Sequence, residues 1–519
     1  MKSKIFSVSG IILFSLFAVN VVILLAALNV SKAWYLVLML TLPLLLVSVY
    51  DRSQKKQSIK RNYPVIGRLR YFFESIRPEL RQYFFESDLD GKPFNRRQRS
   101  IVYQRAKNEK QTVAFGMQAD PLQPGYEWVA HSMYPVHVDV KDLRVTIGNE
   151  YCRKPYAASI LNIGAMSYGA LSKTAIMSLN EGAMLGGFAH NTGEGGISQH
   201  HLCGGDLIWQ IGTGYFGCRT EEGRFDPVSF KERATLSQVK MIELKLSQGA
   251  KPGHGGILPA AKNTAEIAAI RKVEPGTTVF SPMAHREFDD PKELLMFIEK
   301  LRQLSDGKPV GFKLCIGDKR EFRDICVAMR ETGIRPDFIS IDGAEGGTGA
   351  APLEFTDHLG MPLYDAVSFA AATLREFGLH QQVKIIASGK IITGFDILKL
   401  MSLGASACYS ARGMMMALGC IQALVCDSGR CPTGVATQDP RLYKGLHPED
   451  KRHRVASFHA NTIEATKEIM EACGFSSLDK VLPSKFFRRT ADQQTESFEE
   501  IYFPRVSTTL TNFKNILPC

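Results

Sequence analysis

Glycine-rich segments that could hold a flat or anionic ligand follow several short apolar runs of the sequence. Glycine lets the backbone approach a ligand closely and expose its N–H groups to it. One such segment alone is most often a simple turn, but repetition after successive apolar runs indicates a shared binding site. The segments are Gly164–Gly169, Asn191–Gly196, Gln248–Gly256, Gly343–Gly349 and Ser388–Lys390, and Lys313 ends a sixth apolar run.

Three cysteines further along the chain have a spacing that could bind a soft metal. Cys420, Cys426 and Cys431 form a C-x5-C-x4-C pattern. Soft thiolate ligands in a reducing compartment select iron–sulfur clusters or zinc. The alternative is that these cysteines are buried packing residues, which is how we interpret the other eight cysteines of the chain.

These segments need a scaffold that brings the ends of several apolar runs together. Eight runs with strand character alternate with helix-like stretches, which indicates a parallel sheet with crossover helices. Closed into a (β/α)8 barrel, such a sheet places the loops that follow its strands at one end. The predicted strands are Ser159–Ile163, Gly187–His190, Met241–Leu246, Thr278–Ser281, Pro309–Cys315, Asp337–Asp342, Val383–Ser388 and Ala405–Ser410, and the predicted helices include Thr264–Lys272, Pro291–Gln303, Arg320–Thr332, Ala366–Phe377 and Phe395–Leu403.

The residues within these loops resemble the FMN-binding synthase domain of the glutamate synthase large subunit. The resemblance covers residues 150–475 and looks closest to the short proteins that carry this domain without the rest of the large subunit. The segments that carry it are Met166–Lys173, Asn191–Gly196, Gln248–Gly256, Gly346–Pro352 and the run Ala417–Pro440, which contains the three cysteines.

The resemblance implies an FMN site on the loops of the barrel. Lys313 matches a lysine at the pyrimidine edge of the flavin, where a fixed cation stabilises the negative charge of the reduced ring. Backbone N–H groups and a helix N-terminus near Gly394 would hold the phosphate. The cofactor-binding residues implied are Met166, Ser167, Gln248, Lys313, Gly346, Gly347, Thr348, Gly389, Gly394, Gly404, Ala405 and Arg412.

The candidates for the catalytic chemistry are Lys313, Glu194 and Glu345. Glu194 could act as an acid–base or substrate-orienting group, with a helix cap or a structural hydrogen bond as the alternative. The family usually has His-Asp where this chain has Ala-Glu345, and glutamate where it has His254. Both departures fall in loops on the substrate side, so they bear on the substrate more than on FMN.

The resemblance also implies a role for the three cysteines. Their spacing matches the ligands of the 3Fe–4S cluster of glutamate synthase, and Pro432 after the last cysteine matches too. Cys420, Cys426 and Cys431 are therefore the implied metal ligands.

The activity implied is the formation of L-glutamate by reductive amination of 2-oxoglutarate. The sequence shows no glutaminase-type N-terminal cysteine and no second nucleotide fold, and Gly212–Gly217 matches a dinucleotide-binding pattern without the helix that must follow it. We therefore expect ammonia or an amine as nitrogen donor, and ferredoxin or a reductase subunit as electron donor. Two alternatives stay open: amine transfer to glutamate, as in N-methylglutamate formation, and a membrane-tethered electron-transfer or scaffold subunit that holds FMN without turnover.

The N-terminal part of the chain has a different hydropathy and charge from the rest. Ile5–Val30 is free of charge and Ala33–Tyr50 is a second apolar run, both near the length that spans ~30 Å of hydrocarbon. Residues 51–110 then hold 16 Lys and Arg against 7 Asp and Glu. Basic flanks on both sides predict a transmembrane hairpin with both ends in the cytoplasm, whereas a signal peptide would have a shorter apolar region of ~7–15 residues.

We thus expect four parts: a transmembrane hairpin at 1–50, a basic juxtamembrane and N-terminal extension at 51–150, an FMN-binding barrel with an iron–sulfur loop at 151–475, and a C-terminal tail at 476–519. The apolar content of 45% excludes a disordered chain. Most of the net charge of +11 lies beside the hairpin, which argues against nucleic-acid binding and for a membrane. The catalytic part should face the cytoplasm, and assembly into a homo-oligomer is left open.

Overall fold

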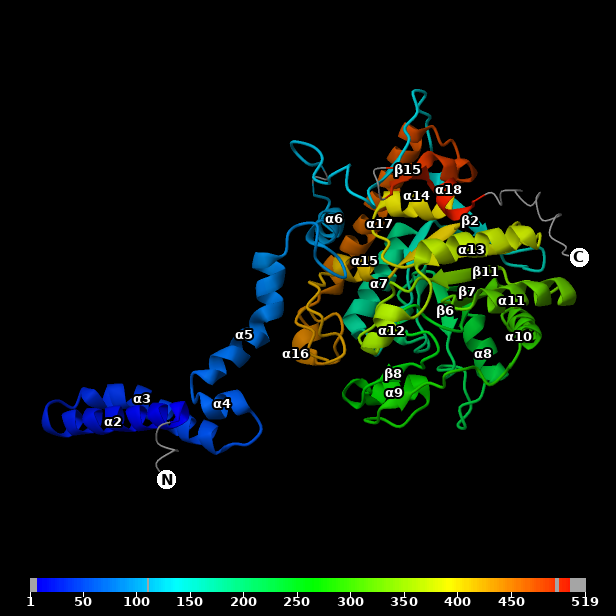
Figure 1. Ribbon diagram of the computed structural model, residues 1–519. Coiled ribbons are helices and arrows are strands. Elements are labelled where there is room, and N and C mark those ends of the chain that lie inside the picture. The colour runs from blue at the N-terminus through cyan, green and yellow to red at the C-terminus, as the bar shows by residue number, and fades with distance from the viewer. Residues whose placement is uncertain (1–6, 110–111, 491–493, 505–519) are drawn as a thin grey trace, which may run out of the picture. The chain divides into compact units, whose positions relative to one another are not determined.

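The computed structural model describes residues 7–109, 112–490 and 494–504. The chain divides into two compact units, Met1–Pro93 and Phe94–Cys519. In Figure 1 the first unit is the blue helical part, and the second is a barrel surrounded by helices. The division falls after Pro93, so residues 94–150 belong to the same compact unit as the barrel.

The first unit begins with two apolar helices, α2 (Val8–Asn29) and α3 (Trp34–Ser53). The Ser7 side chain caps α2 by accepting a hydrogen bond from a backbone N–H of its first turn. Thr41 donates to the Asn20 side chain at 3.0 Å, which ties the two helices together. By length and composition both helices are able to cross a membrane, as the predicted hairpin requires.

The basic segment of this unit is helical. It contains α4 (Ser58–Asn62) and α5 (Gly67–Leu80), and a π-helical turn, η1 (Arg81–Phe85), continues α5. Arg68 pairs with the buried Asp51 of α3 at 2.7 Å. This ion pair fixes the start of α5 to the end of α3.

Eight parallel strands close into a barrel in the second unit, so the predicted fold class is confirmed. The strands follow one another around the barrel in chain order, and their apolar runs are typical of strands buried on both faces. They are β4 (Leu161–Ile163), β5 (His190–Asn191), β6 (Leu207–Ile211), β7 (Val239–Lys245), β10 (Val310–Leu314), β11 (Phe338–Asp342), β12 (Lys384–Ser388) and β13 (Ala407–Ser410).

One predicted strand is wrong, and one barrel strand is absent from the prediction. Thr278–Ser281 lies outside the barrel, because β9 (Val279–Phe280) pairs antiparallel with β8 (Ile257–Leu258) in a separate small sheet. The barrel instead contains β6, all five residues of which are buried. Both segments are short apolar runs near glycines, and only the burial of both faces distinguishes them.

The polarity of the barrel interior changes along its axis. Alternate residues of each strand point inward. The layer at the amino ends is apolar and includes Met241, Phe338, Ile386 and Ala407. In the middle layer Glu243 accepts hydrogen bonds from Asn191, Gln210 and Ser340, while the carboxyl ends carry Lys245, Lys313 and Asp342.

Crossover helices surround the barrel, and the sequence marks where they begin. Ser172, Asp226, Asp290, Asp318 and Thr393 each cap a helix by accepting a backbone N–H of its first turn. The helices are α7 (Lys173–Gly186), α8 (Pro227–Ala234), α9 (Ala265–Arg271), α10 (Pro291–Leu304), α11 (Lys319–Thr332), α12 (Leu353–His358), α13 (Leu363–Glu376) and α14 (Gly394–Ser402).

The two ends of the second unit pack together on the barrel. The long helix α17 (Pro448–Cys473) packs against α7, α14 and α6 (Arg96–Ala106). One sheet joins β1 (Glu127–Val129), β14 (Phe486–Arg489) and β15 (Thr495–Ser497). These contacts explain why the segments before residue 150 and after residue 475 belong to the barrel unit. The remaining elements are β2 (Arg144–Ile147), β3 (Tyr156–Ser159), α15 (Arg412–Ala417), α16 (Pro440–Tyr443) and α18 (Phe498–Tyr502).

Candidate active site

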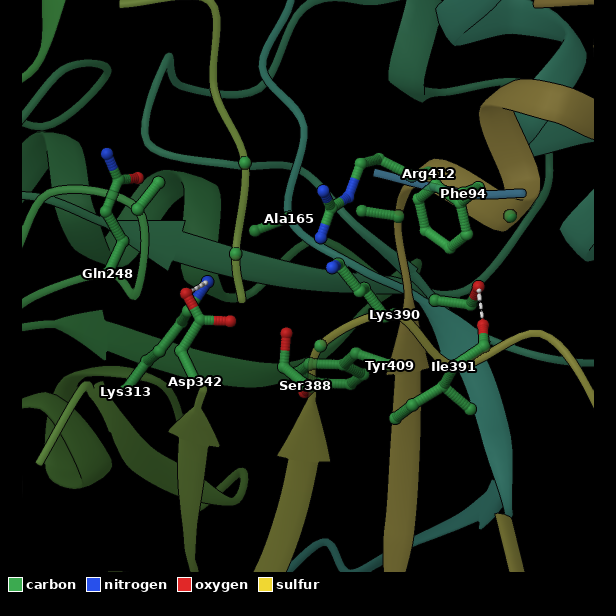
Figure 2. Close-up of a pocket in the computed structure, with 17 residues that line it drawn as sticks. Phe94, Ala165, Gln248, Lys313, Asp342, Ser388, Lys390, Ile391, Tyr409 and Arg412 are labelled. Atoms are coloured by element: carbon green, nitrogen blue, oxygen red, sulfur yellow. Dashed lines mark hydrogen bonds and ion pairs between the residues drawn. The ribbon is translucent and has the colours of Figure 1, made fainter. Parts of the chain in front are cut away.

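A pocket lies at the carboxyl ends of the barrel strands, where the charged layer meets the glycine-rich loops. Figure 2 shows Lys313, Asp342, Ser388 and Tyr409 on adjacent strands at one side of it, and Arg412 and Phe94 at another. We call it the Lys313 pocket. Its loop lining includes Gln248, Gly346, Gly347, Gly389 and Lys390.

Lys313 is a fixed cation in this pocket. It is 6% exposed, and its Nζ lies 3.3 Å from Asp342 Oδ2. Asp342 also accepts the Gly249 N–H at 2.8 Å, which ties the strand end to the Gln248–Gly256 loop. Burial would lower the pKa of Lys313, but the charges of Asp342 and Glu243 raise it above its ordinary value. Such an ammonium is suited to stabilise negative charge on a ligand.

A second side of the pocket combines glycine backbone with two cations, Arg412 and Lys390. A Cβ on Gly347 would lie 2.7 Å from the Arg412 guanidinium, so glycine allows this close approach. Arg412 donates to the Glu345 carbonyl at 2.5 Å, and burial lowers the pKa of Arg412. Gly389 has φ +151°, which other residues rarely adopt. Cations beside tightly placed backbone suit an anionic group such as phosphate.

A second charged group lies next to the Lys313 pocket. Lys245 of β7 and Lys313 of β10 are register partners on neighbouring strands. Lys245 Nζ lies 2.8 Å from Glu194 Oε1. We call Glu194, Lys245, Lys251 and Arg271 the Glu194 cluster.

The Glu194 cluster carries an excess of positive charge. Burial would raise the pKa of Glu194, but the charges of Lys245, Arg271 and Lys251 lower it below its ordinary value. Lys251 is 2% exposed, and burial together with the charge of Lys245 lowers its pKa. Buried charges normally have partners, so three cations around one carboxylate suit a ligand with two negative charges.

Arg271 has unused hydrogen-bonding capacity. It is 5% exposed, and its Nη2 donates to the Tyr168 carbonyl at 3.1 Å. Its Nε has no hydrogen-bond partner among the residues that the structure describes. Burial lowers the pKa of Arg271 to about 10, so it stays charged at neutral pH. A planar guanidinium with free donors is a suitable partner for a carboxylate.

His285 fixes the backbone that carries Lys245. Its Nε2 lies 2.9 Å from the Lys245 carbonyl and therefore donates, and its Nδ1 accepts from the Tyr215 hydroxyl at 2.9 Å. Burial lowers the pKa of His285 to about 4, which keeps the ring neutral at pH 7.

Half of the predicted cofactor-binding residues line the Lys313 pocket: Gln248, Lys313, Gly346, Gly347, Gly389 and Arg412. Met166 and Ser167 follow the lining residue Ala165. A Cβ on Gly193 would lie 2.6 Å from the Ser167 nitrogen, so their loop packs tightly against the Asn191–Gly196 loop. Thr348 is exposed at the rim of the Gly343–Gly349 loop.

Four other predicted residues do not line the pocket: Gly394, Gly404, Ala405 and Glu345. Gly394 begins α14 as predicted, but a Cβ there would lie 2.6 Å from the Thr466 nitrogen, so it allows α14 to approach α17. Gly404 and Ala405 precede β13 and so lie at the amino end of the barrel, opposite the pocket. Glu345 accepts the Leu363 N–H at 3.1 Å with both oxygens, which caps α13.

The charged residues Asp342, Lys245 and Arg271 of the site are absent from the prediction. Asp342 and Lys245 carry the signal that identifies Lys313, a charged side chain that ends an apolar strand. Arg271 ends the short helix α9 beside another basic residue, and nothing in its sequence context distinguishes it from a surface arginine.

The predicted metal ligands lie in the loop between α15 and α16. Burial raises the pKa of Cys420 to about 11, and the charges of Cys426 and Cys431 add to the shift. The described ranges contain no group of three His, Cys, Asp or Glu side chains that could hold one metal ion.

The cysteine loop packs on the Lys313 pocket. A Cβ on Gly349 would lie 2.8 Å from the Asp427 nitrogen, and Gly346 and Gly347 of the same segment line the pocket. The buried Lys262 donates to the Cys426 carbonyl at 2.6 Å. The loop is therefore held against the segment that shapes the pocket.

The chain is similar in sequence to known proteins of one family. The family model for the conserved region in glutamate synthase matches residues 103–476. The glutamate synthase large subunit-like protein YerD of Bacillus subtilis is 40% identical over 474 residues, which cover 83% of this chain and 90% of that protein. The archaeal glutamate synthase (NADPH) of Methanocaldococcus jannaschii is 36% identical over 321 residues, and the match covers 62% of this chain and 60% of that protein.

Proposed function

The chain belongs to the glutamate synthase family, and from this premise we propose that it is an FMN- and iron–sulfur-dependent oxidoreductase that forms L-glutamate by reductive amination of 2-oxoglutarate. The observation that carries the proposal is the register pairing of Lys313 with Lys245. One lysine faces a glycine-lined pocket and the other a buried cluster with excess positive charge. A redox cofactor and a dianionic substrate can then be held side by side.

FMN fits the Lys313 pocket by the chemistry of its walls. Lys313 would stabilise negative charge on the isoalloxazine ring, and Arg412 with Lys390 would hold the phosphate. Gln248 and the Met166–Ser167 backbone would lie at the ring, and Gly346, Gly347, Thr348 and Gly389 would shape the loops around it. When bound, FMN supplies hydride transfer to the substrate carbon.

The Glu194 cluster supplies the partners for 2-oxoglutarate. Arg271 would pair with one carboxylate, and Lys251 with the other. Glu194 is ionised beside Lys245, so it orients that ammonium rather than acting as an acid. The reaction condenses 2-oxoglutarate with ammonia, releases water, and adds a hydride to C2 and a proton from solvent to nitrogen.

Cys420, Cys426 and Cys431 would hold a 3Fe–4S cluster. Such a cluster would supply single-electron transfer from a separate donor protein, ferredoxin or a reductase subunit. Replacing Cys426 with serine should remove iron from the purified protein. The control is Cys473→Ser, because Cys473 is a buried cysteine that lies outside the pattern. If the Cys426→Ser variant holds as much iron as iron-containing wild type, the assignment of these cysteines as ligands is wrong.

We place the catalytic unit in the cytoplasm, attached to a membrane by α2 and α3. The support is the length of the two helices and the basic residues on both flanks. The full chain should sediment with membranes and resist high salt, whereas a chain without residues 1–50 should be released. A full-length protein found in the soluble fraction would contradict this placement.

The reaction itself can be tested by isotope transfer. Reduced protein is incubated without oxygen with 2-oxoglutarate and 15N-ammonium, and glutamate is analysed by mass spectrometry. The proposal predicts L-glutamate labelled with 15N. N-methylglutamate labelled with 15N, formed with 15N-methylamine while ammonium gives no product, would favour amine transfer. No product with either nitrogen donor would favour an electron-transfer subunit.

A further inference from the structure

Phe94 is a residue of the Lys313 pocket that lies before the region matched by the family model. It is fully buried and lines the pocket. It is also the first residue of the barrel unit, whereas the family match begins at residue 103. A segment that precedes the shared domain therefore completes a wall of the pocket.

The backbone of Phe94 is held by the cysteine loop. Its N–H donates to Gln422 Oε1 at 3.2 Å, and its carbonyl accepts from Gln422 Nε2 at 3.1 Å. Gln422 is 9% exposed and lies two residues after Cys420. Paired hydrogen bonds of a buried amide fix both the position and the direction of the segment.

The ring of Phe94 lies against the cation of the pocket. The Arg412 guanidinium carbon is 5.0 Å from its ring centroid, within the range of a cation–π contact. Figure 2 shows the two side chains next to each other at the pocket wall. The Glu345 carbonyl accepts from the same guanidinium. These contacts leave the Arg412 side chain little freedom to turn away from a ligand.

We propose that Phe94 is a positioning residue for FMN, which acts by holding Arg412 toward the phosphate and is itself held by Gln422. The inference rests on the proposed function, because it assumes that FMN occupies the Lys313 pocket. It adds that the affinity for the phosphate group of FMN depends on a residue that precedes the region matched by the family model. The cysteine loop and the phosphate site are then coupled through one amide.

The test compares two ligands that differ in the phosphate alone. Full-length Phe94→Leu protein is purified in detergent, freed of flavin, and titrated with FMN and with riboflavin while flavin fluorescence is followed. Leucine keeps an apolar side chain but removes the π-face, so the Kd for FMN should rise about tenfold, the size of a partly buried cation–π contact. The Kd for riboflavin should stay close to that of wild type. Gln422→Leu should weaken FMN binding in the same direction.

The matched control is Val102→Ala, which removes buried volume from α6 in the same segment without touching the pocket. It should lower the melting temperature and leave the Kd for FMN unchanged. The inference is overturned if Phe94→Leu binds FMN like wild type, or loses FMN and riboflavin equally. The inference is also overturned if Val102→Ala weakens FMN binding as strongly as Phe94→Leu does. Wild-type protein that binds no FMN would instead refute the proposed function, and this inference with it.

Discussion

The Lys313 pocket and the Glu194 cluster are built from the same unit, a lysine at the end of a barrel strand paired with a carboxylate. Lys313 pairs with Asp342 at 3.3 Å, and Lys245 pairs with Glu194 at 2.8 Å. The two lysines are register partners. What differs is the surroundings of each pair.

Around Lys313 the loops contribute glycine backbone, which leaves room for a flat ligand. Around Lys245 a loop contributes Lys251 and helix α9 contributes Arg271, which leave positive charge for a small dianion. On this account the strands set the place of the chemistry, and the segments between them set its ligand. It also predicts that changes in one region should affect one ligand and spare the other.

The largest effect is expected from Arg271→Met. Removing a buried charged partner of a carboxylate costs about 2–5 kcal/mol, so KM for 2-oxoglutarate should rise on the order of 10²–10³. The Kd for FMN and the flavin spectrum should not change. Steady-state kinetics and flavin titration measure the two effects, with Arg330→Met on the surface of α11 as control. A parallel loss of FMN would mean that the two regions are one site.

The converse variant is Lys313→Met, which keeps the length of the side chain and removes its charge. The rate of flavin reduction should fall on the order of 10², as when one charge-stabilising donor is lost. KM for 2-oxoglutarate should stay within the error of the wild-type value. Stopped-flow reduction kinetics provide the measurement, and wild-type kinetics in the variant would remove Lys313 from the redox site.

A smaller effect is expected from Glu194→Gln, which keeps the shape of the side chain but leaves Lys245 without its ion pair. Loss of the carboxylate adds positive charge to the cluster, so the anionic substrate should bind no more weakly, while kcat should fall about tenfold because Lys245 is no longer oriented. Separate determination of kcat and KM distinguishes this outcome from a loss of binding. A rise in KM with constant kcat would contradict the orienting role.

The smallest effect is expected from low pH, which should reduce the stability of the folded chain. Burial lowers the pKa of His190 to about 3, of His285 to about 4 and of His459 to about 3. The unfolded chain binds these protons near pH 6.5 and the folded chain does not, so this contribution is complete above pH 6.5 and is lost as pH falls toward 4. The melting temperature should decline over that window. His285 supports Lys245, whereas the described residues that line the Lys313 pocket include no histidine. Substrate binding should therefore weaken before FMN binding.

The sequence predicts the barrel and the Lys313 pocket because both depend on local patterns. A parallel strand buried on both faces reads as a short apolar run, and a charged residue that ends it points to the open end of the barrel. β6 and β9 show the limit: both are apolar and flanked by glycine, and only tertiary packing places one inside the barrel and the other outside.

Arg271 and Phe94 could not be predicted because their roles arise from distant contacts. Arg271 is a helix residue whose burial depends on the loops around Glu194. Phe94 becomes part of the pocket only through Gln422 and Arg412, both more than 300 residues later in the chain. Gly394 shows the opposite case, since the predicted helix begins there but serves packing against Thr466.

The central claim is that FMN and 2-oxoglutarate meet at the pair formed by Lys313 and Lys245. The most direct test is the flavin absorbance of the reduced protein, followed without oxygen while 2-oxoglutarate and ammonium are added separately and then together. The account predicts that the oxidised flavin bands return only when both are present, and that Arg271→Met abolishes this return at the same substrate concentration. Bands that return with neither substrate, or equally with one alone, would contradict it.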